Sequence, residues 1–217
     1  MTRDVRVCFL GDSFTQGIGD PEQRGWVGRV LQSTMVGGVA VTGFNLGIRR
    51  NTSEDIVRRC WDEVTPRTTL DADNRLVLGF GSNDAVEEDG RLRVDPASSL
   101  DNLTALLRAS ERRAISALVV GPPPVADAGS AHLQRLLKLA QGMAGVCGEW
   151  GVTFVDVTQT LAEDRGWLQE ANARDEPTPE RSGTPGWPNS SGAAAGNGGL
   201  PNLFRGTHLR LTRSLRG

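Results

Sequence analysis

The sequence predicts an α/β protein in which a five-stranded parallel sheet lies between two layers of helices. Short apolar runs bounded by Gly, Pro, Asn or Asp recur along the chain and alternate with segments of helical periodicity. This alternation is typical of strand–helix–strand units, which build a parallel sheet covered on both faces. The runs are almost continuously apolar, as expected of strands buried on both sides. The expected strands are residues 5–10, 39–44, 75–80, 115–120 and 152–157.

The first expected strand ends abruptly in Gly11-Asp12-Ser13. Gly11 permits a tight exit from the strand, and Asp12 and Ser13 are residue types that favour a turn or a helix N-cap. Open α/β sheets bind their ligands at the carboxyl ends of the strands, so this position suits a functional serine. Backbone N–H groups of the following turn can stabilise a developing negative charge there. Capping of a helix by Ser13 is an equally open interpretation of this segment alone.

Four longer segments have the apolar periodicity of amphipathic helices. Their apolar faces begin at Trp26, Ile56, Leu100 and Leu133. Thr52 or Ser53 is expected to cap the second of these helices, with Asp55 in its first turn. A short helix through Leu161 is expected after the last strand. Each helix thus follows a strand, as the predicted architecture requires.

Two further loops with polar or small residues follow expected strands. Residues 45–51 come after the second strand and contain Gly47, and Gly81-Ser82-Asn83-Asp84 follows the third strand at once. The carboxyl ends of parallel strands share one edge of the sheet. Ser13, Gly47 and Asn83 are therefore expected to converge at that edge.

Length, charge and cysteine content limit the possible functions. The chain has 217 residues, enough for one domain with a substantial core, and its net charge of -2 and pI near 5.8 suggest neither a nucleic-acid partner nor an anionic membrane. No apolar run is long enough to span a bilayer, and the expected first strand leaves no room for a signal peptide. The cysteines Cys8, Cys60 and Cys147 form no metal-type pair, so reduced, buried thiols and a cytoplasmic location are expected.

The segment from about Glu176 differs in composition from the rest of the chain. Gly, Pro, Ser and Asn dominate it without any apolar period, and the residues from Arg205 to Gly217 are basic and equally irregular. Such a composition buries too little apolar surface to offset chain entropy. We therefore expect a domain over residues 1–175 and an irregular, disordered tail over residues 176–217.

The blocks at Gly11-Asp12-Ser13, Gly47 and Gly81-Ser82-Asn83-Asp84 together resemble the SGNH (GDSL-type) ester hydrolases. The resemblance runs from the first strand to about Asp175, and each block ends an expected strand. It implies a flavodoxin-like α/β fold and an acyl-serine mechanism. A lone Gly-Asp-Ser is weak as a motif, whereas three ordered blocks are specific.

The resemblance implies that Ser13 is the nucleophile. It also implies that the backbone N–H groups of Ser13 and Gly47, with the side-chain amide of Asn83, form the oxyanion hole. Such donors stabilise the charge that builds on the carbonyl oxygen during attack on an ester. A side chain at Gly47 is expected to crowd the substrate. A plain turn glycine at Gly47 and a turn former at Asn83 remain open, and Asp12 is expected to order the turn.

The pattern breaks at the general base, which this family supplies near the C-terminus as Asp-x-x-His. Asp175 stands at the matching position, but Thr178 occupies the place of the histidine. The chain's histidines are His132 and His208. His132 lies at the start of an expected helix, where a surface or capping role is expected, and His208 lies in the irregular tail with no carboxylate nearby in sequence. As written, the catalytic base is missing.

A frameshift near Asp175 is a hypothesis that explains both this departure and the change in composition. With GC-rich codons and one G restored after the Asp175 codon, the chain reads Asp-Gly-Ala-His-Pro-Gly-Ala-Val-Gly-Tyr and continues as an amphipathic helix. This reading contains the Asp-x-x-His block. The DNA across codons 172 to 180 tests the hypothesis, which fails if no single-base change restores the block.

These patterns predict a cytoplasmic serine ester hydrolase that acts on a small acyl ester or thioester and needs no metal or organic cofactor. Two alternatives belong to other classes of protein. One is a flavodoxin-like binding module whose Gly11–Gly19 loop holds a phosphate, although the loop lacks both common phosphate-binding glycine motifs. The other is a non-catalytic descendant that binds esters or sugars. Arg49 and Arg50 either meet an anionic substrate group or form a solvated loop pair.

Overall fold

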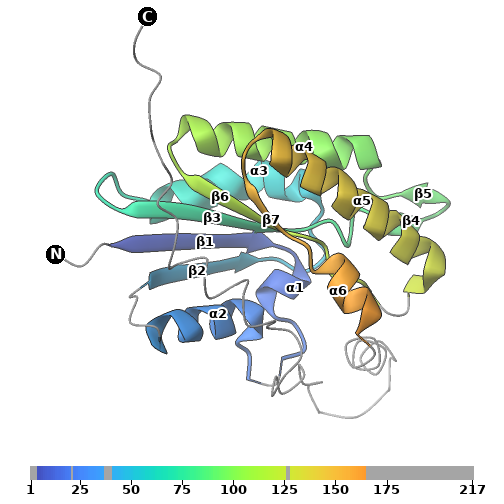
Figure 1. The fold of residues 1–217 in the computed structure, drawn as a ribbon, viewed down its shortest axis with the longest axis horizontal. Helices are drawn as coiled ribbons and strands as arrows, with labels where there is room; N and C mark the ends of the chain where they lie inside the picture. Colours follow the sequence, from blue (N-terminus) through green and yellow to red (C-terminus); the bar gives the residue numbers. More distant parts are fainter. Residues whose placement is uncertain (1–3, 21, 37–40, 126–127, 165–217) are drawn as a thin grey trace, which may run out of the picture.

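The computed structural model describes residues 4–20, 22–36, 41–125 and 128–164. Five strands form one parallel sheet in the order β2-β1-β3-β6-β7 (Figure 1). Their bounds are β1 Val5–Gly11, β2 Val41–Gly47, β3 Asp73–Gly79, β6 Ser116–Val120 and β7 Thr153–Val155. The predicted five-stranded α/β fold is confirmed.

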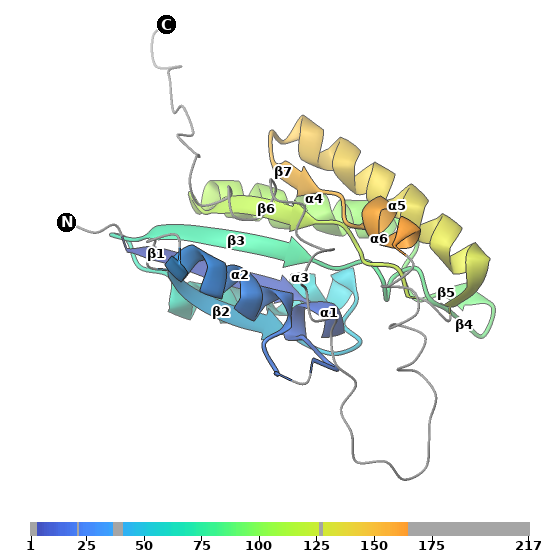
Figure 2. The ribbon, with the colours of Figure 1, turned by 60° about the horizontal axis from the view of Figure 1, so that its bottom comes forward.

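Helices cover both faces of this sheet. Figure 1 shows α3, α4 and α5 on one face and α2 on the other, and Figure 2 shows the same layers from a second direction. The helices are α1 Ser13–Gln16, α2 Gly25–Val36, α3 Ser53–Val64, α4 Pro96–Arg112, α5 Gly129–Glu149 and α6 Thr158–Glu163, with a 3-10 turn η1 at Thr65–Arg67. A small antiparallel hairpin, β4 Glu87–Glu88 and β5 Arg91–Leu92, stands apart from the main sheet.

The core consists of two apolar clusters, one on each face of the sheet. Alternate residues of β1 point to opposite faces, so Cys8 and Leu10 pack with the α3–α5 layer while Val7 and Phe9 pack with α2. Trp26 of α2 packs edge-on against Phe9, with ring centroids 5.7 Å apart. Burial on both faces explains the continuous apolar run of β1.

The cysteines of the chain are buried in the α3–α5 cluster and are free thiols. Burial raises the pKa of Cys8 to about 11, that of Cys60 to about 12 and that of Cys147 to about 11. The thiol form therefore persists at neutral pH, and a buried thiol of this kind is unreactive. The expectation of buried thiols is confirmed.

Local capping at α3 follows the sequence closely. The Thr52 side chain accepts a hydrogen bond from the Asp55 N–H, and Asp55 accepts one from the Thr52 N–H in return, which is a complete capping box. The second strand differs from the prediction, because residues 45–47 continue β2 instead of opening a loop. They pair in register with residues 9–11 of β1, and this long-range pairing overrides the weak strand preference of Asn and Gly.

Candidate active site

Glycines of neighbouring strands lie in register at the carboxyl edge of the sheet, where Gly11 of β1 pairs with Gly47 of β2 and with Gly79 of β3. A Cβ at Gly11 would lie 2.0 Å from Thr15 Oγ1, and a Cβ at Gly47 would lie 2.1 Å from Gln16 N. The backbone of α1 thus rests directly on this edge of the sheet. A side chain at Gly47 would meet α1 rather than a substrate, which corrects the reason expected for this glycine.

Ser13 is the first residue of α1, and the helix is capped by its neighbour. Asp12 Oδ1 accepts a hydrogen bond from the Phe14 N–H at 2.9 Å, and Gly17 ends the helix with a φ of 85°. The interpretation of Ser13 as a mere cap is therefore wrong. Ser13 is half-buried, and among the described residues none forms a hydrogen bond with its hydroxyl. The hydroxyl is available for chemistry.

Asp12 is a buried carboxyl group, with only 1% of its surface exposed. Burial raises the pKa of Asp12 to about 7, because a charged carboxylate loses its hydration there. The backbone N–H of Phe14 opposes this shift, and the nearby Asp84 adds to it. A carboxyl group next to Ser13 thus titrates near neutral pH.

Asn83 lies beside this turn. Its Nδ2 donates to Asn51 O at 3.0 Å and approaches Asp12 Oδ2 at 3.4 Å. The next residue, Asp84, is buried and accepts from the Ser53 N–H of α3 at 2.8 Å. The structure therefore brings Ser13 and Asn83 together, and the amide side chain of Asn83 is held in place by its partners.

Arg59 of α3 reaches into the same region, which the sequence did not indicate. Its Nη2 donates to Gly11 O at 2.9 Å, its Nε to Asn51 Oδ1 at 2.7 Å and its Nη1 to Glu63 at 2.8 Å. Only the helical spacing of Arg59 and Glu63, four residues apart, was visible in the sequence. Arg59 thus connects α3 to the end of β1 and to the loop after β2.

Most backbone N–H groups at residues 47–51 are already bonded. Gly47 N donates to Asn45 Oδ1 at 3.0 Å, Ile48 N to Gly11 O at 3.0 Å, Arg49 N to Gln16 Oε1 at 3.0 Å, and Asn51 N to Ile48 O at 3.2 Å. Within this stretch only the Arg50 N–H has no partner among the described residues, and Arg50 adopts a left-handed φ of 66°. The free backbone donor of this loop is therefore at Arg50 and not at Gly47.

The side chains of the adjacent arginines differ in their surroundings. Arg50 forms an ion pair with Glu88 of the β4–β5 hairpin at 2.8 Å, and its carbonyl accepts from Arg93 at 2.9 Å. Both members of the pair are at least half exposed, so its contribution to stability is small. Arg50 is thus part of a loop-to-hairpin contact, while the Arg49 side chain is exposed beside it.

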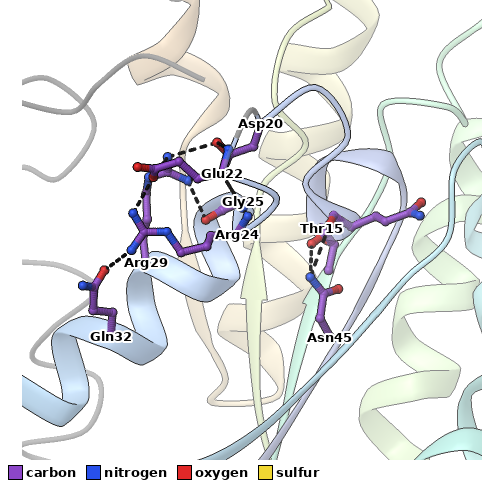
Figure 3. Close-up of polar contacts among 9 residues, drawn as sticks. Thr15, Asp20, Glu22, Arg24, Gly25, Arg29, Gln32 and Asn45 are labelled. Atoms are coloured by element: carbon purple, nitrogen blue, oxygen red, sulfur yellow. Dashed lines mark hydrogen bonds and ion pairs between the residues drawn. The ribbon is translucent and has the colours of Figure 1, made fainter. Parts of the chain in front are cut away.

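A polar cluster fixes the segment between α1 and α2 (Figure 3). The carboxylate of Asp20 accepts from the N–H groups of Glu22, Arg24 and Gly25, and it is paired with Arg29. This pairing holds the pKa of Asp20 well below its usual range. Figure 3 also shows Asn45 of β2 reaching the end of α1, where its Nδ2 donates to Thr15 O at 2.8 Å.

His132 is buried on α5, with 1% of its surface exposed, so the expected surface or capping role is wrong. Its Nδ1 lies 3.1 Å from Ala85 O, which also accepts from Arg135 Nε at 3.0 Å. Burial, and then the charge of Arg135, lower the pKa of His132, which favours the neutral ring. Its Nε2 is buried and has no hydrogen-bond partner among the residues that the structure describes. Tertiary packing of α5 against the Ala85 loop explains this burial, which the position of His132 in the sequence did not indicate.

The remaining candidate residues, Asp175, Thr178 and His208, lie outside the described residues. Within the described ranges, no three His, Cys, Asp or Glu side chains are grouped as metal ligands would be. No helix in those ranges has the length and apolar character needed to cross a membrane. Within the described residues, the candidate site thus consists of Ser13, the amide of Asn83 and their supporting contacts.

The chain thus belongs to the α/β proteins that carry a serine at the carboxyl edge of a parallel sheet, at the first residue of a helix. Within that class, the model of the GDSL-like lipase/acylhydrolase family matches residues 9–195. The chain belongs to this family of ester hydrolases. The matched range includes Asp175 and the first part of the segment expected to be irregular.

Individual proteins resemble the chain more distantly. The uncharacterized protein YpmR of Bacillus subtilis (strain 168) is 32% identical over 87 residues, which are 38% of this chain and 33% of that protein. The chain therefore matches only about a third of the length of this curated relative.

Solved structures share the fold at low sequence identity. AlinE4, an SGNH-hydrolase family esterase, is 18% identical with a TM-score of 0.64, over 83% of this chain and 88% of that one. The lipase/acylhydrolase from Enterococcus faecalis is 23% identical with a TM-score of 0.60, over 75% and 81% of the two chains. These structures agree with the five-stranded fold.

Proposed function

We propose that the chain is a serine ester hydrolase in which Ser13 Oγ attacks the carbonyl carbon of a small acyl ester or thioester. The observation that carries the proposal is the unbonded Ser13 hydroxyl at the first position of α1, with the Asn83 amide anchored beside Asp12. Attack forms the bond from Oγ to the carbonyl carbon and expels the alcohol or thiol, leaving an acyl-serine. Membership of the GDSL-like family supports the same reaction.

Negative charge builds on the carbonyl oxygen during this attack, and fixed donors must stabilise it. We assign this task to the Ser13 N–H and to Asn83 Nδ2. The Gly47 N–H is the third proposed donor, and without substrate it is bonded to Asn45 Oδ1. Loss of a single oxyanion donor typically lowers the rate by about 10²–10³-fold.

The Ser13 proton needs a base, which the family supplies as a histidine oriented by a carboxylate. Asp175 is proposed as that carboxylate, and Thr178 stands where its histidine is expected. His132 is engaged with Ala85, and no described residue bonds the Ser13 hydroxyl. We therefore propose that the base is missing and that the scaffold retains only a residual rate, on the order of 10³–10⁴ over water.

The binding-module alternative is less consistent with the site. A phosphate at the start of α1 would meet the Asp12 carboxyl group, which already occupies the helix N-cap. The Phe14 N–H at the start of α1 is therefore not free to bind a phosphate. The cytoplasmic location stays a prediction that accompanies the hydrolase proposal.

Exposure of the full chain to p-nitrophenyl acetate tests the proposal. We expect intact-mass and peptide analysis to find one acetyl group on Ser13, accumulating over time because deacylation also needs the absent base. The Ser13→Ala variant should remain unmodified, and Ser33→Ala, which changes an exposed serine of α2, should react like the wild type. A wild-type chain without acetyl on Ser13 would overturn the proposal. Rapid turnover that depends on Ser13 would show that a base is present, and His208 would be the first candidate for it.

A further inference from the structure

Arg59 is largely buried, although arginine side chains are normally exposed. Only 15% of its side chain is accessible, whereas the neighbouring Arg58 on the same helix is 73% exposed. A buried guanidinium is tolerated only when its donors are paired. Arg59 meets this condition through three acceptors on three different segments of the chain, at Gly11, Asn51 and Glu63.

The hydrogen bonds of Arg59 are part of a ring of contacts next to Ser13. From Gly11 O the ring passes through Arg59 to the Asn51 side chain, and from Asn51 O to Asn83 Nδ2. Asn83 Nδ2 in turn approaches Asp12, which is bonded covalently to Gly11. The ring therefore joins the ends of β1 and β3 and the loop after β2, and two of these segments carry Ser13 and Asn83.

The geometry of the ring requires an arginine. A guanidinium is planar and presents its N–H groups in fixed directions, so it can hold two acceptors at a set separation. A lysine ammonium is a compact charge on a flexible stem and fixes no such angle. Glu63, one turn further along α3, balances the charge of Arg59 at 2.8 Å. The main contribution of the Arg59 side chain to the site is therefore orientation.

We propose that Arg59, acting through Asn51, is the positioning residue that fixes the Asn83 amide relative to Ser13. Arg59 holds Asn83 Nδ2 in this position before a substrate binds, at the place where the carbonyl oxygen of the ester develops charge. The inference rests on the proposed function for its catalytic consequence. Its structural consequence, the orientation of the Asn83 amide, stands independently of any reaction.

Variants at position 51 test the link without removing a buried charge. Asn51→Ala removes the acceptor of Arg59, while Asn51→Asp keeps an oxygen there. We expect Asn51→Ala to slow acetylation of Ser13 by about 10–10²-fold, the loss that a small misplacement of a reacting group produces, and Asn51→Asp to restore most of the rate. The side-chain amide resonance of Asn83, assigned with Asn83→Asp, should shift in Asn51→Ala and return in Asn51→Asp.

Arginine variants supply the matched comparison. Arg59→Lys should slow acetylation and shift the Asn83 resonance, and Arg58→Lys on the exposed face should do neither. Equal acetylation rates and an unmoved Asn83 resonance in folded Arg59→Lys and Asn51→Ala would overturn the proposal. If the wild type is not acetylated, the hydrolase proposal fails, and the Asn83 resonance in the same variants still decides whether Arg59 positions the amide.

Discussion

Asp12 and Asp20 lie on either side of α1 and expose almost none of their surface, yet the pKa values of their carboxyl groups shift in opposite directions. Asp20 is paired with Arg29 and accepts three backbone N–H groups, so its pKa lies well below the usual range. Asp12 has no cationic partner in the described ranges, and burial raises its pKa to about 7. The loss of hydration dominates at Asp12 and the cationic partner dominates at Asp20, so both depth of burial and partners decide the ionisation of a carboxyl group.

The contrast indicates that Asp20 is a structural anchor, whereas Asp12 belongs to the candidate active site. Asp20 organises the segment between α1 and α2 and is stable as an anion. Asp12 remains beside Ser13 in an unfavourable environment, where its carboxyl oxygens touch the Phe14 N–H and the Asn83 amide. Groups with strongly shifted pKa values concentrate at functional sites, which fits the position of Asp12.

Loss of the Asp20 charge is expected to have the largest effect on stability. Asp20→Asn leaves Arg29 without its buried anion and should lower the free energy of unfolding by about 3 kcal/mol, measured by urea denaturation at pH 7. Glu22→Gln, at a half-exposed carboxylate of the same cluster, should change it by less than about 1 kcal/mol. Because the pKa of folded Asp20 is lowered, the difference from wild type should shrink as the pH falls below about 4. Equal losses in the two variants would contradict the anchor role of Asp20.

A smaller loss is expected at Gly25, which donates to Asp20 at 2.7 Å. Gly25 has a φ of 55°, and a Cβ there would lie 2.7 Å from Gly17 Cα. We expect Gly25→Ala to lower the thermal midpoint by the equivalent of about 2 kcal/mol, since both the backbone conformation and the contact are strained. Gly145→Ala serves as the control, because an exposed helical glycine with no neighbour within 4 Å should be neutral or stabilised by alanine. An unchanged midpoint in Gly25→Ala would contradict this prediction, because the segment between α1 and α2 would then accommodate a Cβ at Gly25 without strain.

The smallest effect is expected at Asp12, and it should have the opposite sign. The raised pKa means that folded Asp12 binds a proton more tightly than the unfolded chain, so wild-type stability falls as the pH rises from about 4 to about 7. Asp12→Asn is neutral throughout and keeps an oxygen for the Phe14 N–H, although its new amide faces Asn83. We expect it to be about 1 kcal/mol more stable than the wild type at pH 8, where the new amide offsets part of the gain, and less stable than the wild type at pH 4. A pH-independent difference in urea denaturation would argue against a raised pKa for Asp12.

The sequence indicated where the candidate residues lie, because strand ends define those positions. Ser13 and Asn83 each follow a strand that the apolar pattern identified, and parallel pairing brings such ends to one edge. The surroundings of Gly47 were not predictable in this way. Sequence shows a glycine at a strand end, but only the register with Gly11 and the side chain of Asn45 reveal that packing of α1 and an occupied N–H account for it.

The sequence by itself determined the features that depend on local interactions. These are the alternation of strands and helices, the capping box at Thr52 and the position of Ser13 after β1. These features depend on side-chain type and on spacings of a few residues. Only the tertiary structure decided the burial of His132, the ionisation of Asp12 and the ring through Arg59, Asn51 and Asn83. These features join residues far apart in the chain, and their energies arise from burial and from hydrogen-bond partners that exist only once the sheet has assembled its carboxyl edge.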